Sequence, residues 1–407
     1  MITYIEKLLN GQPVEWKTLE EVFYIRNGYT PSKANKEFWD NGYIPWFRME
    51  DIRANGGILK DSALHITPQA VKGKGLFKRD SIILATSATI GVHALLAVDC
   101  LANQRFTNFQ VSQEFVRLLL PKYIYYYFFV IDDWCKKNVQ LGNFPSVELE
   151  KLKRHAIPIP PLSVQEEIVR ILDKFTELEA ELEAELEARK QQYEYYRNSL
   201  LSFANDLEGG LWKPLGEACE VIGGFAFKSS LFKEEGMPII RIGNITASNH
   251  INMDDSKCFN PEDYAGINFQ SYLTQAGDIL VAMSGATTGK IGYYTGEEVS
   301  YINQRVSKLS PKSDILNNRF LYHYLLGKSD YLYHLAGGGA QPNLSAKDLR
   351  TRLLIPLPPL AEQERIARIL DKFDALTNSL TEGLPQEIEL RRKQYEYYRE
   401  QLLSFPA

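Results

Sequence analysis

Two segments of the chain carry apolar residues at the three- and four-residue spacing that is typical of an amphipathic helix. The first apolar stripe runs over 168–203 and the second over 366–405. Polar residues separate the stripe positions, so each segment predicts a long helix with one buried face. Gly383 and Pro385 lie inside the second segment. We expect a kink or break near them, because a proline within a helix cannot donate to the hydrogen-bond ladder.

The two predicted helices are copies of one repeat. The nineteen residues at 157–175 recur with few changes at 355–373, and the sequence Gln-Tyr-Glu-Tyr-Tyr-Arg occurs at 192–197 and again at 394–399. Leu-Glu-Ala-Glu units fill the middle of the first copy. A match of this length indicates a tandem duplication with a period of about 200 residues.

The repeat divides the chain into four parts. We expect two divergent domains at 1–155 and 211–353, and helical spacers at 156–210 and 354–407. The predicted fold is two α/β (α+β) domains joined by two long antiparallel coiled-coil helices. Antiparallel helices of equivalent sequence are related by a two-fold axis, so the duplication predicts a pseudo-two-fold arrangement.

Each domain shows the same order of short elements. β-rich runs at 81–85 and 279–282 predict strands of a curled mixed sheet. Aromatic-rich runs at 123–130 and 320–326 predict a packed helix in each domain. Both copies also contain a loop rich in Gly, Ser and Thr and, further along, the tripeptide Asn-Gln-Arg.

A net charge of −5 is unfavourable for a protein that binds nucleic acid, but the negative charge is not evenly distributed along the chain. The helical segments 163–203 and 361–405 hold 19 acidic and 12 basic side chains. The rest of the chain holds 32 acidic and 34 basic side chains, which permits local basic patches against phosphate. The four cysteines show no Cys-x-x-Cys pairing and predict ordinary reduced thiols of a cytoplasmic protein. Neither a membrane span nor a secretory signal is expected.

No catalytic or metal-binding motif is complete. The segment 284–291 resembles a phosphate-binding loop, but only three residues separate its glycines, and Ile291 stands where Ser or Thr would bind magnesium. The six histidines lack metal-ligand spacing. We therefore expect no catalytic residue, cofactor or metal in this chain.

Several polar side chains in the two domains are of the types that contact DNA, since Arg bonds guanine and Asn or Gln bonds adenine. The candidates of the first domain are Lys33, Arg48, Ser87, Thr89, Gln104, Arg105 and Asn143. Those of the second domain are Lys228, Ser229, Arg241, Thr287, Thr288, Lys290, Gln304, Arg305, Gln341 and Asn343. The arginines shared by both copies fit an internal salt bridge or a phosphate contact better than base discrimination. The Gly/Ser/Thr loops at 86–91 and 284–290 fit contacts with the DNA backbone.

The repeated helical segments resemble the conserved regions of type I restriction-modification specificity subunits. The resemblance rests on the Gln-Glu-x-Ile-x-x-Ile-Leu-Asp-Lys-Phe run, the Leu-Glu-Ala-Glu units and the Gln-Tyr-Glu-Tyr-Tyr-Arg ending, and it extends over essentially the whole chain. It implies that each recognition domain reads one half of a split target in double-stranded DNA. The Leu-Glu-Ala-Glu units resemble the tetrapeptides that set the spacing between the half-sites in that family.

The resemblance also implies partners. Two adenine-specific methyltransferase subunits would dock on the helices, and restriction/translocase subunits would complete an ATP-dependent endonuclease of a bacterial or archaeal cytoplasm. S-adenosylmethionine, ATP and Mg would then bind to those partners. The alternative is a coiled-coil scaffold that joins other proteins without reading DNA.

Overall fold

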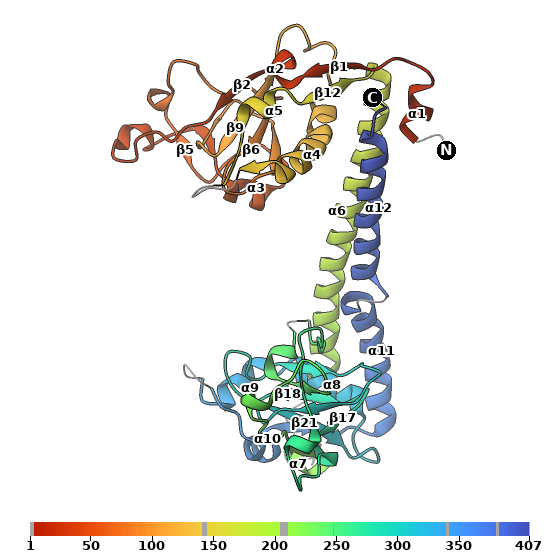
Figure 1. Ribbon diagram of the computed structural model, residues 1–407. Coiled ribbons are helices and arrows are strands. Elements are labelled where there is room, and N and C mark those ends of the chain that lie inside the picture. Colours follow the sequence, from red (N-terminus) through yellow and green to blue (C-terminus); the bar gives the residue numbers. More distant parts are fainter. Residues whose placement is uncertain are drawn as a thin grey trace. The chain divides into compact units, whose positions relative to one another are not determined.

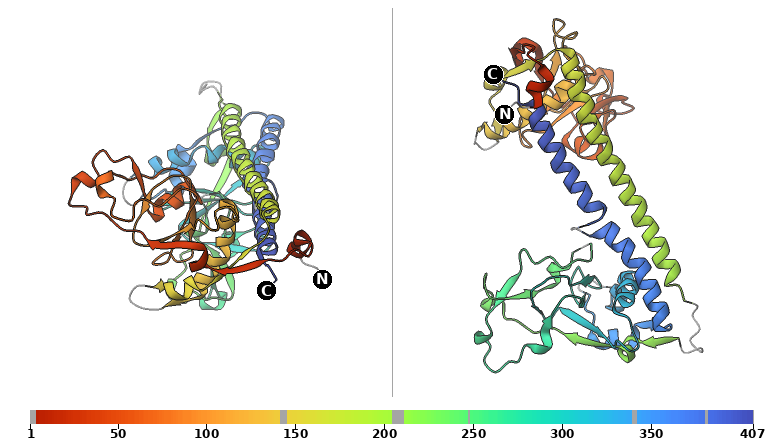
Figure 2. Two further views of the ribbon diagram at one scale, coloured as in Figure 1. Left: turned by 90° about the horizontal axis from the view of Figure 1, so that it is seen from above. Right: turned by 90° about the vertical axis from the view of Figure 1, so that its right-hand side faces the viewer.

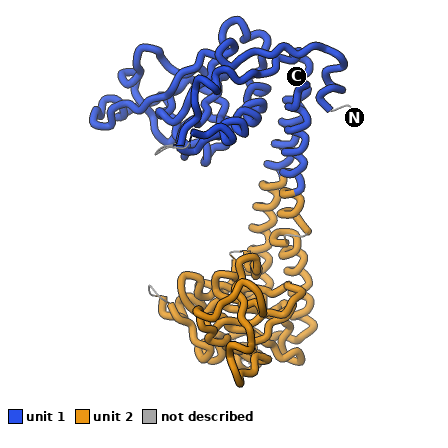
Figure 3. Tube along the Cα trace, viewed as in Figure 1, with its two compact units in different colours: residues 1–181, 390–407 blue, residues 182–389 orange. Residues whose placement is uncertain are grey.

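The chain forms two compact units, each of which contains parts of both helical repeats. The computed structural model describes residues 4–140, 145–203, 211–246, 248–338, 342–379 and 382–406. Unit 1 comprises Met1–Glu181 and Leu390–Ala407, and unit 2 comprises Leu182–Glu389 (Figure 3). Both boundaries between the units fall within predicted helical segments. No helix among the described residues is long and apolar enough to cross a membrane.

Unit 1 contains a five-stranded sheet of order β2-β9-β6-β7-β4 and a three-stranded sheet of order β5-β3-β8 (Figure 1). Strands β3 and β8 pair in parallel, as do β4 and β7, while the other pairs are antiparallel. The expected mixed sheet is therefore confirmed. The strands are β1 Glu15–Thr18, β2 Phe23–Asn27, β3 Ile44–Phe47, β4 Ile58–Leu59, β5 His65–Ile66, β6 Ile82–Ala85, β7 His93–Leu96, β8 Leu101–Ala102, β9 Phe106–Val111, β10 Val139–Gln140, β11 Ser146–Val147 and β12 Ala156–Ile159.

The helices of unit 1 complete its core. They are α1 Tyr4–Leu9, α2 Leu19–Val22, α3 Met49–Asn55, α4 Pro121–Lys137, α5 Leu149–Lys153 and the first part of α6 Leu162–Leu200. Helix α4 packs between the large sheet and α6, where Phe109, Phe128, Ile168 and Leu172 share one buried cluster. The aromatic run expected to form a helix thus forms one, and that helix extends beyond the predicted ends.

Unit 2 repeats this plan with sheets of order β14-β21-β18-β19 and β16-β15-β20-β17. Its strands are β13 Trp212–Pro214, β14 Cys219–Gly223, β15 Met237–Ile240, β16 Lys257–Phe259, β17 Leu273–Thr274, β18 Ile279–Ala282, β19 Ile291–Tyr293, β20 Ser300–Ile302, β21 Val306–Pro311 and β22 Leu354–Pro356. Its helices are α7 Leu215–Ala218, α8 Asn318–Leu326, α9 Ser329–Leu335, α10 Ala346–Arg352 and α11 Leu360–Asn378, and α12 Leu384–Leu403 begins in this unit.

Within each unit, the beginning of one helical repeat packs antiparallel to the end of the other (Figures 1 and 2). In unit 1 the ring of Phe175 on α6 stacks on Tyr398 of α12, with ring centroids 5.4 Å apart. In unit 2 the equivalent Phe373 on α11 stacks on Tyr196 of α6, also at 5.4 Å. Each domain is therefore followed by a helix that is paired with the end of the other repeat.

The predicted break in the second repeat is confirmed. Helix α11 ends at Asn378 and α12 begins at Leu384. Gly383 has φ +82°, and a Cβ atom there would lie 2.5 Å from the carbonyl oxygen of Ala375. Pro385 is the second residue of α12, where a backbone N–H has no partner within the helix. The proline thus starts a new helix after the break.

Candidate nucleic-acid interface

A tight turn with the sequence Asn-Gln-Arg joins β8 to β9 in unit 1 and β20 to β21 in unit 2. The Asn103 side chain accepts a hydrogen bond from the backbone N–H of Arg105 at 2.9 Å. Asn303 accepts one from the N–H of Arg305 at 3.4 Å. The asparagine builds the turn in both copies, and the Gln and Arg side chains that follow it are exposed.

A glycine lies directly against each turn. A Cβ atom on Gly28 would lie 2.3 Å from the carbonyl oxygen of Ala102, and one on Gly224 would lie 2.1 Å from that of Asn303. No larger residue fits without moving the backbone of the turn. Neither glycine is marked by a local sequence pattern, but both directly follow the equivalent strand, so a comparison of the two copies could have found them.

The Gly/Ser/Thr loops lie beside the turns. The N–H of Thr86 donates to the carbonyl of Arg105 at 3.1 Å, and that of Met283 donates to the carbonyl of Arg305 at 2.8 Å. Ser87 forms an isolated β-bridge with Ser146. The structure thus brings the loop that carries Ser87 and Thr89 next to the turn that carries Gln104 and Arg105.

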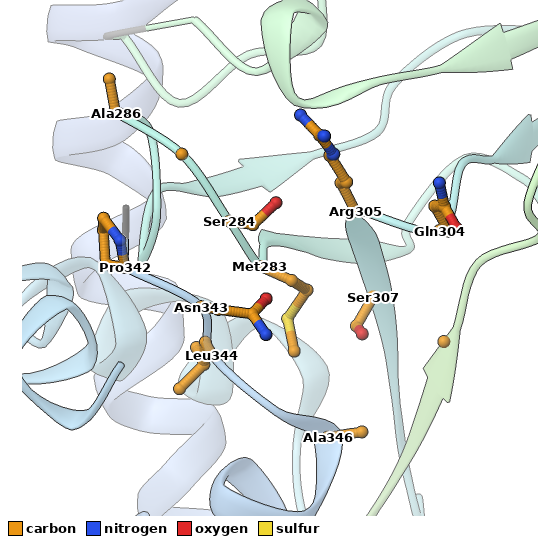
Figure 4. Close-up of a pocket in the computed structure, with 12 residues that line it drawn as sticks. Met283, Ser284, Ala286, Gln304, Arg305, Ser307, Pro342, Asn343, Leu344 and Ala346 are labelled. Carbon is orange, nitrogen blue, oxygen red and sulfur yellow. The ribbon is translucent and has the colours of Figure 1, made fainter. Parts of the chain in front are cut away.

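In unit 2 the loop and the turn line an open cleft of about 690 Å³. Ser284 forms a β-bridge with Asn343, which places that predicted residue in the cleft wall. Figure 4 shows Ser284 and Asn343 projecting toward the strand that follows Arg305. The Ser284 hydroxyl oxygen is buried and has no hydrogen-bond partner among the described residues. The cleft therefore has an exposed cation, Arg305, and next to it a buried hydroxyl that lacks a hydrogen-bond partner in the described part of the chain.

Two further predicted arginines approach the turns from β3 and β15. Arg48 directly follows β3, and Arg241 directly follows β15. The preceding residues, Phe47 and Ile240, accept hydrogen bonds from the asparagine N–H of each turn at 3.1 and 2.9 Å. Each arginine therefore lies next to an Asn-Gln-Arg turn.

The charges of these arginines are weakly compensated. Arg48 Nε lies 4.0 Å from a carboxylate oxygen of Glu50, which is a marginal ion pair. Arg241, Arg105 and Arg305 have no ion-pair partner among the residues that the structure describes. Internal salt bridges thus do not explain the shared arginines, and their charges remain available to an anion.

Other predicted residues follow the strand that ends at each glycine. Thr30 donates from its hydroxyl to Gln104 at 2.6 Å, which holds the segment bearing the exposed Lys33 at the first turn. In unit 2 the N–H of Gln304 donates to the carbonyl of Phe225 at 2.8 Å. The exposed residues Lys228 and Ser229 follow shortly after Phe225.

The loop 284–290 contains supporting residues as well. Thr288 is 5% exposed, and its hydroxyl donates to the carbonyl of Gly285 at 2.7 Å. This bond stabilises the loop from inside, so we do not retain Thr288 as a direct contact. Thr287 and Lys290 are partly exposed on the same loop. The predicted residues Asn143 and Gln341 lie outside the described residues.

Both turns and both loops lie in segments that match a known family. The family described as "Type I restriction modification DNA specificity domain" matches residues 13–188 and 211–390. The chain belongs to this family. The EcoprrI specificity subunit of Escherichia coli is 40% identical over 94% of this chain and 92% of its own length. The EcoR124I/EcoR124II specificity subunit of the same species is 32% identical over 100% of this chain and 98% of its own.

Solved structures agree on the fold. A structure described under the assembly and conformational transition of the type I restriction-modification system matches with a TM-score of 0.63 and 18% identity, over 96% of this chain and 98% of the other. The S subunit from M. genitalium matches with a TM-score of 0.51 and 16% identity, over 98% and 97%. The family match and the similar subunits of Escherichia coli identify the chain as a type I specificity subunit with two tandem DNA specificity domains.

Proposed function

We propose that this specificity subunit reads a bipartite target in double-stranded DNA, with one half-site for each domain. The observation that carries the proposal is the recurrence of one arrangement in both units: an Asn-Gln-Arg turn beside a Gly/Ser/Thr loop, with exposed and weakly compensated arginines. The side chains around it differ between the copies, since Lys33 follows the first glycine and Lys228 and Ser229 follow the second. A shared frame with different side chains suits two different half-sites.

The residues divide into two roles under this proposal. The shared arginines Arg48, Arg105, Arg241 and Arg305 contact phosphates and fix the position of the duplex, because common contacts carry no sequence information. Side chains that differ between the copies contact base edges, among them Lys290 and Asn343 of the second domain, whose positions are occupied by Val92 and Ser146 in the first.

The helices are the proposed docking surface for two adenine-specific methyltransferase subunits, which restriction subunits would join. Tyr195 on α6 and Tyr397 on α12 occupy equivalent positions of the repeat and are 69% and 58% exposed. Large exposed tyrosines are common at protein interfaces. S-adenosylmethionine, ATP and Mg²⁺ would be bound by those partners. Residues 13–155 of the first domain and the whole of the second lie within segments that match a DNA specificity domain, which favours this interpretation over a scaffold that ignores DNA.

Competition binding tests the proposal. The complex of this chain with its methyltransferase subunits is offered its target duplex and two duplexes in which one half-site is scrambled. Scrambling either half should reduce the affinity by about 10³-fold or more, toward the level of non-specific binding. Equal affinity for all three duplexes would favour the scaffold alternative.

A further inference from the structure

The first domain carries a basic turn that the second domain lacks. Residues 72–79 read Lys-Gly-Lys-Gly-Leu-Phe-Lys-Arg, with four cationic side chains, all of them exposed. The equivalent segment, 269–276, reads Phe-Gln-Ser-Tyr-Leu-Thr-Gln-Ala and has none. The second domain adopts the shared fold without these four charges, so the fold itself does not require them.

Two of the four charges are compensated within the domain. Lys78 lies 2.7 Å from Asp99, and Arg79 lies 3.3 Å from Asp80. Lys72 and Lys74 have no ion-pair partner in the part of the chain that the structure describes. The uncompensated positive charge is therefore concentrated on these two lysines.

The turn is held in place by a fifth cation. Arg26 on β2 donates to the backbone carbonyls of Lys74, Gly75 and Leu76 at 2.8, 3.0 and 2.6 Å. Its guanidinium also lies 4.7 Å from the centre of the Phe77 ring. A turn fixed in this way loses little conformational freedom when it binds a ligand. Arg26 adds a positive charge behind the turn, since arginine stays protonated in proteins.

The basic turn adjoins the Asn-Gln-Arg turn of the same unit. The ammonium of Lys72 lies 5.2 Å from the centre of the Tyr29 ring. The next residue, Thr30, donates its hydroxyl to Gln104. At the other end of the segment, the N–H of Phe77 donates to the carbonyl of Cys100 at 2.8 Å, just before β8 leads into the turn. A duplex lying on the Asn-Gln-Arg turn therefore has Lys72 close to its flank, and Lys74 follows two residues further along the basic turn.

We propose that Lys72 and Lys74 form a phosphate clamp for the DNA backbone flanking the half-site read by the first domain. This inference rests on the proposed DNA-reading function. The ligand is the polyanionic backbone of duplex DNA, and the contact is independent of base sequence. Because the second domain lacks the clamp, the two half-sites contribute unequally to the electrostatic part of the affinity.

The salt dependence of binding tests the clamp in the complete complex with the methyltransferase subunits. The slope of log affinity against log salt concentration is measured for the wild type and for K72Q/K74Q. Each lost phosphate contact should reduce the magnitude of the slope by about 0.9, so the double variant should lose about 1.8. At 0.1 M salt its affinity should fall roughly eight-fold for each lysine, while the methylated sequence stays the same.

Two control variants separate the clamp from simpler effects. K72R/K74R keeps both charges and should keep the wild-type slope. K233Q/K257Q removes two lysines of the second domain that are already paired with Asp263 and Glu234, and it should also keep that slope. Equal melting temperatures will show that the fold is intact.

A wild-type slope in K72Q/K74Q, or an equal loss in K233Q/K257Q, would overturn the clamp. Failure of the proposed function has a different signature, because the wild-type complex itself would then not prefer its target duplex.

Discussion

His323 on α8 donates a hydrogen bond from Nε2 to a carboxylate oxygen of Asp371 on α11 across 2.7 Å. The histidine is fully buried. In unit 1 the equivalent contact joins the hydroxyl of Tyr126 on α4 to Asp173 on α6, also at 2.7 Å. The same aspartate of the repeat thus anchors each domain to the helix that follows it, through a different partner in each copy.

The buried hydrogen bond between His323 and Asp371 predicts that the stability of the folded chain depends on pH. Burial lowers the pKa of His323 in the folded chain, so the unfolded chain binds this proton more readily. Its contribution to stability is complete above about pH 6.5, the ordinary histidine pKa, and is lost as the pH falls toward the lower folded-state pKa. Over that window one group changes the free energy of unfolding by at most about 1.4 kcal/mol per pH unit.

Chemical denaturation between pH 7 and pH 5 measures this effect. H323Q removes the titrating group and should show a shallower decline of stability than the wild type. Burial also lowers the pKa of His155, but that contribution is common to both proteins and cancels in the difference. An equal decline of stability in the wild type and in H323Q would show that His323 does not cause the pH dependence.

Gly224→Ala should displace the Asn-Gln-Arg turn of unit 2 and lower the stability of the chain. The added Cβ would meet the carbonyl oxygen of Asn303 at 2.1 Å, so the turn must shift, at a cost of roughly 1–3 kcal/mol. A Cβ atom on the neighbouring Gly223 would meet no heavy atom within 4 Å, and Gly223→Ala should change stability by less than about 0.5 kcal/mol. Thermal unfolding compares the two variants, and equal stability would contradict the close approach at Gly224.

Arg305→Gln should weaken DNA binding evenly across sequences. The arginine is exposed at a turn found in both copies, so it fits a phosphate contact. Its loss should reduce the salt slope of the complex by about 0.9 and leave the methylated motif intact. Relaxed recognition at a single base pair would instead assign Arg305 to base readout.

Deletion of Leu182–Glu185 tests whether α6 sets the gap between the half-sites. These four residues form one Leu-Glu-Ala-Glu unit and account for about 6 Å of helix. If the length of α6 sets the gap, the recognised gap should shorten by about one to two base pairs, at roughly 3.4 Å per pair. Methylation mapping of the variant measures the gap directly. An unchanged gap would show that the length of α6 does not set it.

The sequence predicted the features that depend on local pattern and on the repeat. The long α6 helix and the break before Leu384 follow from apolar spacing and from Gly383 and Pro385. The Gly/Ser/Thr loops and the Asn-Gln-Arg turns were found by comparing the two copies, and the structure brings them together in each unit.

Features that depend on tertiary approach were missed. Gly28 is required because the carbonyl of Ala102 lies where its side chain would be, which no local pattern reveals. The role of Asn103 inside the turn and the burial of the Thr288 hydroxyl needed hydrogen-bond partners from the fold. The uncompensated charge on Lys72 also depends on the fold, because Asp99 pairs with Lys78 and Asp80 pairs with Arg79.

Genome-wide mapping of methyladenine, in strains with and without this gene, tests the central claim most directly. A specificity subunit with two DNA-reading domains predicts the loss of one motif, made of two short defined halves separated by a gap of fixed length. A methylation pattern that is identical in the two strains would contradict the account.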